Sequence, residues 1–278
     1  MPLASTPERS LLASYHLPER RFRAGAALPA PLRPIWEALR TRRTRDAQIA
    51  LRHALASLPE DAAHASLRAA LLYGLAATHL HDGHPSLVER YARESLALEP
   101  RQWAAPRILL EILEARHAYE EAYLYLTERL AGPTGPAWDD PLPERDQYLA
   151  AAAWTWHIGD FEAAARFVHC AYPDGLPTMP SDLQEDCFRL ALYRDQPDEA
   201  AEAAACLITN RPVESADALL QTIVHQGWTA QALPLYRSVY ASDPGNELLR
   251  RRLIALCIRE GVIDEARKLS SLGVLKAS

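Results

Sequence analysis

Apolar residues recur at helical spacing along most of the chain. Leu75 and Ala76 lie three and four positions after Leu72, and Ile223 lies four positions after Leu219. This spacing gathers apolar side chains on one face of a helix. A short turn and a second helical stretch follow each such stretch, so the pattern predicts a series of helical hairpins.

The hairpins share a fixed set of positions. The residue Gly227 at a predicted turn is followed by Ala232, Tyr236, Val239 and Pro244, and Gly83, Gly159 and Gly261 open similar stretches. The predicted turns lie at Arg42, Gly83, His117, Gly159, Asp195, Gly227 and Gly261. Their separations are 41, 34, 42, 36, 32 and 34 residues, so the sequence predicts an internal repeat with a period near 34.

Each recurring residue has a physical reason. Small side chains such as Ala164, Ala232 and Ala266 let two helices approach closely. Glycine at the turn allows a left-handed cap after the first helix. Proline ends the second helix because it clashes with the preceding turn and lacks an N–H. These closing prolines are Pro59, Pro100, Pro212 and Pro244.

On these residues the chain resembles the tetratricopeptide repeat family over residues 28–278. The resemblance implies an all-α fold, a right-handed α-solenoid of about seven helix-turn-helix hairpins. The first unit departs from the family pattern because its leading helix carries Pro31 and Pro34. The second unit departs from it because Val88 is larger than the expected small residue. The expected units lie near residues 28–68, 69–102, 103–144, 145–180, 181–212, 213–246 and 247–278.

Three segments lie outside the repeat pattern. The N-terminal arm, residues 1–27, carries a short apolar cluster formed by Leu11, Leu12, Tyr15 and Leu17. It either caps the first hairpin or docks as a peptide into a groove of its own or a neighbouring chain, and we expect capping. The proline-rich insertions 131–144 and 173–182 are either functional loops or spacers that change the superhelical twist, and we expect spacers.

In the family, the first helix of each hairpin lines a concave groove that binds protein partners. The resemblance therefore implies a mixed aromatic, imidazole and arginine surface that suits an amphipathic helix or an extended peptide. Trp156 is equally well explained as a core residue, because Trp154 and Trp156 cannot face the same side of one helix. The candidate groove residues are Tyr73, His81, Arg107, Trp156, His157, Tyr193, His225, Arg251, Arg252 and Arg259, with Glu114 and Asp217 among further positions on the same helices.

The charge distribution along the chain indicates a second kind of partner. The first 58 residues hold ten Arg and four acidic residues, a net charge of +6. Because the whole chain carries −6, the remaining residues carry −12. Arg40, Arg42, Arg43 and Arg45 form a basic patch near the first turn. This patch is either a solvated turn, which we expect, or a contact for nucleic acid in a regulatory protein, which is the less favoured function.

Nothing in the motifs indicates catalysis, a cofactor or a metal. The chain has no G-x-S-x-G nucleophile motif, no P-loop and no G-x-G-x-x-G motif. The cluster of His79, His81, Asp82 and His84 only loosely resembles a metal-binding motif, and we expect His79 to pack in a core instead. We therefore expect no enzyme and predict a scaffold or adaptor for a protein or peptide partner.

The composition also indicates the cellular compartment and the role of the cysteines. The sequence has a pI near 5.9, and it has neither an apolar run of membrane-spanning length nor a secretory signal at its start, so we expect a cytoplasmic protein. The cysteines have no C-x-x-C spacing and are expected to be core thiols. They are Cys170, Cys187, Cys206 and Cys257.

Overall fold

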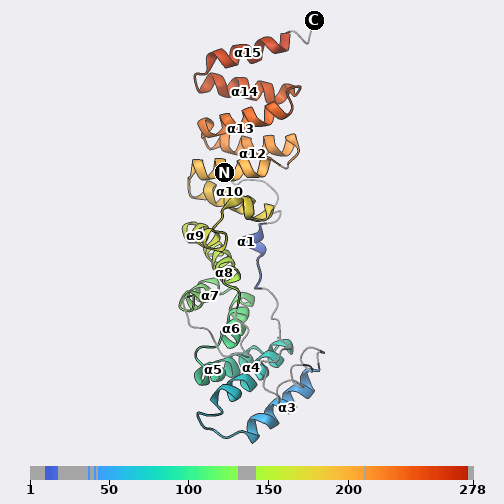
Figure 1. Ribbon diagram of the computed structural model, residues 1–278, viewed down its shortest axis with the longest axis vertical. Coiled ribbons are helices and arrows are strands. Elements are labelled where there is room, and N and C mark those ends of the chain that lie inside the picture. Colours follow the sequence, from blue (N-terminus) through green and yellow to red (C-terminus); the bar gives the residue numbers. More distant parts are fainter. Residues whose placement is uncertain are drawn as a thin grey trace. The chain divides into compact units, whose positions relative to one another are not determined.

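The computed structural model describes residues 10–17, 37, 41, 43–130, 142–209 and 211–274. Within these ranges the chain forms α-helices and one short 3-10 helix, η2, without a strand (Figure 1). The described part is therefore all-helical, as predicted. The helices are α1 (Leu11–Ser14), α3 (Thr44–Ser57), α4 (Ala65–His81), α5 (Pro85–Leu98), α6 (Ala104–Ala115), α7 (Tyr119–Thr127), α8 (Glu144–His157), α9 (Phe161–Ala171), η2 (Leu176–Thr178), α10 (Ser181–Tyr193), α11 (Pro197–Ile208), α12 (Val213–His225), α13 (Thr229–Ser242), α14 (Glu247–Arg259) and α15 (Ile263–Val274).

The chain divides into two compact units. We call Tyr15–Gly159 the N-terminal unit, and Met1–Ser14 together with Asp160–Ser278 the C-terminal unit. In the N-terminal unit each helix from α3 to α8 packs against the next one in the chain. In the C-terminal unit the same holds from α9 to α15, and α1 packs on α10. This is the succession of helical hairpins that the sequence predicts. No described helix is both long enough and apolar enough to cross a membrane.

The hairpin turns adopt the left-handed backbone that the glycine pattern predicts. In the α4–α5 turn the His84 N–H donates to the carbonyl of His79 at 2.9 Å, and in the α14–α15 turn the Val262 N–H donates to Cys257 at 2.7 Å. These bonds satisfy helix carbonyls that would otherwise lack a partner. The predicted turn at Arg42 lies outside the described residues. The other turn residues have φ values of 75° (Gly83), 57° (His117), 81° (Gly159), 55° (Asp195), 86° (Gly227) and 75° (Gly261).

The predicted packing and stopping residues also take their expected places. Ala164, Ala232 and Ala266 are all buried, so helices approach closely at these points. Helix α5 ends two residues before Pro100, and α13 ends two residues before Pro244. Local chemistry therefore sets both the spacing and the length of these helices.

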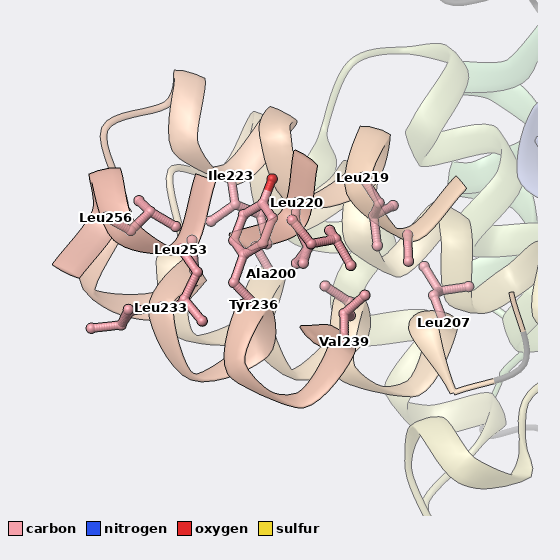
Figure 2. Close-up of a cluster of buried hydrophobic side chains, with 14 of the residues drawn as sticks. Ala200, Leu207, Leu219, Leu220, Ile223, Leu233, Tyr236, Val239, Leu253 and Leu256 are labelled. Atoms are coloured by element: carbon pink, nitrogen blue, oxygen red, sulfur yellow. The ribbon is translucent and has the colours of Figure 1, made fainter. Parts of the chain in front are cut away.

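Each unit has its own hydrophobic core. In the C-terminal unit, Leu220, Ile223, Tyr236 and Leu253 from α12, α13 and α14 pack into one cluster (Figure 2). In the N-terminal unit the central helix is α4, which α3, α5 and α6 all contact. Every residue of α4 from 69 to 79 is buried as a result.

The two proline-rich insertions differ in how far the structure describes them. Residues 131–141 of the first insertion lie outside the described residues. The second forms η2 and is held by Gln184, whose side-chain amide donates to the carbonyls of Leu176 at 2.9 Å and Met179 at 3.2 Å. It is therefore an ordered turn between α9 and α10.

Candidate functional site

The described part of the N-terminal arm docks onto leading helices of the hairpins. We call residues 10–17 the docking segment. Leu12 has no exposed surface, and its backbone N–H donates to Asp186 Oδ2 on α10 at 2.8 Å. Ser10 caps α1 by accepting a hydrogen bond from the Ala13 N–H at 2.9 Å. Helix α1 packs on α10, so for residues 11–14 the structure has the alternative of docking onto the chain itself in place of the expected capping of the first hairpin.

Asp186 is a buried carboxylate that depends on its neighbours. It has no exposed surface, and burial raises its pKa, while hydrogen bonds from the Leu12 backbone, Ser10 and Arg189 act in the opposite direction. Arg189 Nη1 lies 3.1 Å from Asp186 Oδ1. A buried charge is tolerated only when hydrogen bonds and an opposite charge replace the lost water. The docking segment supplies part of that replacement.

The last three residues of the docking segment belong to the N-terminal unit and dock with similar chemistry. Leu17 is buried, and its N–H donates to Glu114 Oε2 on α6 at 3.4 Å. The Tyr15 hydroxyl donates to the carbonyl of Asp146 on α8 at 3.3 Å. Burial raises the pKa of Glu114. It also raises the pKa of Tyr15, and the charge of the nearby Arg107 opposes that rise.

These contacts hold a short segment of the chain against helices of the repeat. Two backbone N–H groups pair with carboxylates, and the side chains of Leu12 and Leu17 are buried. Glu114 is among the groove positions predicted from the sequence, whereas Asp186 is not. A signal was present, because Asp186 occupies the apolar stripe of α10 between Leu183 and Leu190, where an unpaired acid is costly.

Two predicted groove residues are not exposed. Tyr73 is 2% exposed and belongs to the core of the N-terminal unit. Arg107 is 3% exposed, and its Nε lies 4.0 Å from Glu111 Oε1. The prediction that a partner contacts these side chains directly is wrong for this conformation. Arg107 acts instead on the electrostatics around Tyr15.

Most of the remaining groove candidates lie at the hairpin turns. His81, His157, Tyr193, His225 and Arg259 are exposed, and each is the last residue of its helix. They therefore line the edge of their unit beside the turns and not the middle of a helix face.

Two of these terminal residues stack on the next ring along the edge. The His157 ring lies on Tyr119 with centroids 4.2 Å apart and planes 9° apart. Tyr193 lies on Phe161 with centroids 4.5 Å apart and planes 16° apart. Trp156 is half-buried, whereas Trp154 is 1% exposed, so Trp154 is the core member of that pair.

The arginines of α14 have different roles. Arg252 Nε lies 3.0 Å from Asp217 Oδ1, which also accepts a hydrogen bond from the buried Tyr236 hydroxyl at 2.9 Å. Arg252 therefore joins α14 to α12. Arg251 is exposed and pairs with Glu247 at 2.9 Å.

The predicted basic patch is described only in part. Arg43 and Arg45 are exposed, and Arg43 Nε donates to Thr41 Oγ1 at 3.2 Å. Arg40 and Arg42 lie outside the described residues. The patch as a contact for nucleic acid stays a prediction.

The cysteines and the histidines of the predicted cluster differ in burial. Cys257 is buried and Cys187 and Cys206 are half-buried, but Cys170 is exposed, so the expectation of a core thiol is wrong for Cys170. His79 is buried and stacks on Tyr91 with centroids 5.6 Å apart. His81 and His84 are exposed. Over the ranges that the structure describes, no three His, Cys, Asp or Glu side chains are arranged to hold a metal ion.

The C-terminal unit also contains a cavity of about 640 Å³ between α9, η2, α10 and α11. Its wall includes the apolar residues Leu176, Met179 and Leu190 and the thiol of Cys187. Arg194 at this cavity is held by Glu162 at 3.0 Å and Glu199 at 2.7 Å. Nothing in the structure shows what fills the cavity.

Comparison with known proteins yields a fold likeness alone. No protein-family model matches the chain, and no curated protein matches it. Among solved structures it is similar to the crystal structure of PilW, described as a widely conserved type IV pilus biogenesis factor. The identity is 16%, the TM-score is 0.44, and the match covers 80% of this chain and 96% of the other. A likeness of this size does not transfer a function.

Proposed function

We propose that this chain is a non-catalytic protein-interaction scaffold that binds a partner peptide or helix on the leading helices of its hairpins. The docking segment is the observation that carries the proposal. Leu12 is buried where α1 packs on α10, Leu17 is buried in the N-terminal unit, and their N–H groups pair with Asp186 and Glu114. These helix faces thus have the chemistry to hold a short peptide.

The hairpin architecture favours this function. Packed helices hold the binding residues in place before a partner arrives, so the scaffold loses little conformational entropy on binding. We place the chain among tetratricopeptide-like proteins and in the cytoplasm as parts of the same proposal. No described feature favours the nucleic-acid alternative.

Site-specific photo-crosslinking tests the proposal. A benzophenone amino acid replaces Tyr193 or His225, which are exposed at the ends of leading helices, and, as the control, Ser238, which is exposed on the trailing helix α13. We expect discrete protein adducts from the first two positions after irradiation in cells that express the protein, and none from the third. Equal labelling at all three positions, or the absence of protein adducts, would contradict a binding surface on the leading helices.

A further inference from the structure

The site around Asp186 makes few sequence-specific contacts with the segment that occupies it. Asp186 accepts a backbone N–H, which every residue except proline carries, and the apolar contact is a single leucine side chain. Ser10 caps the helical turn and its side chain also hydrogen-bonds to Asp186, and serine or threonine supplies both contacts. Any peptide that starts a helical turn with such a cap and has leucine two residues later meets these demands.

The same site is costly to leave empty. Asp186 has no exposed surface, and the Leu12 N–H, the Ser10 side chain and Arg189 surround it. Withdrawal of the docking segment removes two of these three partners and exposes the Leu12 side chain to water. Exchange of one peptide for another is therefore favoured over an open site.

We propose, on the basis of the function proposed above, that the docking segment is an intramolecular ligand and that a partner displaces it with a peptide of the same pattern. The pattern is Ser or Thr, one residue of any type, then Leu, at the start of a helical turn. The partner is thus defined by a capped leucine turn and needs no net charge. The resting chain occupies its own binding site.

The docking segment is covalently tethered to its site, so the strength of its competition with an incoming peptide can be calculated. A tethered ligand acts at an effective concentration on the order of millimolar. If the free segment binds with a dissociation constant of about 10 to 100 µM, the tethered copy weakens an incoming peptide by about 10- to 100-fold. Loss of the leucine contact in the chain removes this competition.

The test uses the full chain and a fluorescent peptide of residues 10–17. Leu12→Asp places a charge in the apolar site, whereas Ala13→Asp changes a neighbouring exposed residue and is the matched control. Fluorescence anisotropy measures peptide binding to both variants and to the unchanged chain, after circular dichroism has established that each is helical. We expect the peptide to bind L12D about 10- to 100-fold more tightly than it binds the unchanged chain or A13D.

A second peptide controls for non-specific binding, and a milder variant is used if L12D does not fold. A peptide that itself carries the Leu12→Asp change should not bind L12D, and if L12D does not fold, L12A takes its place with a smaller gain in the same direction. Equal affinity for the unchanged chain and L12D would overturn the intramolecular ligand while leaving a peptide site. No binding to any folded variant would also overturn it, and the photo-crosslinking would then decide the scaffold function by itself.

Discussion

At the residue scale, His79 shows how burial turns a side chain into a pH-sensitive element of the fold. It is 3% exposed, and its ring nitrogens have no hydrogen-bond partner among the described residues. Burial lowers its pKa, and Arg52, His84 and Arg90 lower it further, while Asp82 opposes them. The neutral ring is therefore the form that folding favours.

This environment predicts acid destabilisation of the N-terminal unit. The pKa of His79 in the folded state lies below the unfolded value of 6.5. Between these two pKa values the unfolded chain therefore binds more protons than the folded chain does. The contribution of His79 is complete above pH 6.5 and is lost as the pH falls towards the folded value, with a slope no steeper than about 1.4 kcal/mol per pH unit. Urea unfolding at pH 7.5 and pH 5.5 should show this loss in the unchanged chain and a smaller one in His79→Phe.

The neighbouring His81 provides the control. It lies on the same helix but is exposed, so His81→Asn should retain the full pH dependence of the unchanged chain. If His79→Phe and His81→Asn lose stability equally between the two pH values, the account of the buried ring is wrong.

At the element scale, the hairpin turns repeat one backbone conformation with different residues. Gly227 has a φ of 86°, and a Cβ built there meets no atom within 4 Å. Asp195 holds the equivalent position in the α10–α11 turn with a φ of 55°. The left-handed conformation costs little for glycine and more for a residue with a side chain, so the sequence variation between turns should appear as differences in stability.

Substitutions at these turns should change stability in opposite directions. Gly227→Ala should lower the free energy of unfolding by about 1 kcal/mol because alanine is strained at positive φ, and Asp195→Gly should raise it by about 0.5 to 1 kcal/mol. Gly245 is the matched control, because it lies outside the left-handed region and a Cβ there makes only ordinary contact, 3.6 Å from Asp243. Denaturant midpoints give the comparison, and a Gly245→Ala loss as large as that of Gly227→Ala would refute a conformational cause.

At the scale of the whole molecule, local chemistry could be predicted from sequence and distant contacts could not. The turns at His117 and Asp195 are predicted without a glycine, because the repeat positions on either side of them fix their place. The prediction that Tyr73 lines a groove is wrong, because the central part of α4 is apolar all round and three helices cover α4. An apolar stripe this wide indicates a buried helix, and that signal was in the sequence.

The docking segment shows the limit of the prediction. Leu12 and Asp186 are 174 positions apart, and Leu17 and Glu114 are 97 positions apart. Repeat spacing relates each hairpin to its neighbours but says nothing about which helices a segment outside the repeat contacts. The apolar residues of the arm were recognisable, and their binding place was not.

Amide hydrogen exchange at Leu12 tests most directly the central claim that the leading helices hold a peptide. In the full chain the Leu12 N–H should exchange slowly, because it is buried and bonded to Asp186. In Asp186→Ala this protection should fall, while the amides of α14 in the same unit stay protected. Exchange of Leu12 in the unchanged chain at the rate of an unfolded peptide would contradict the docked segment, and with it the observation that carries the proposed function.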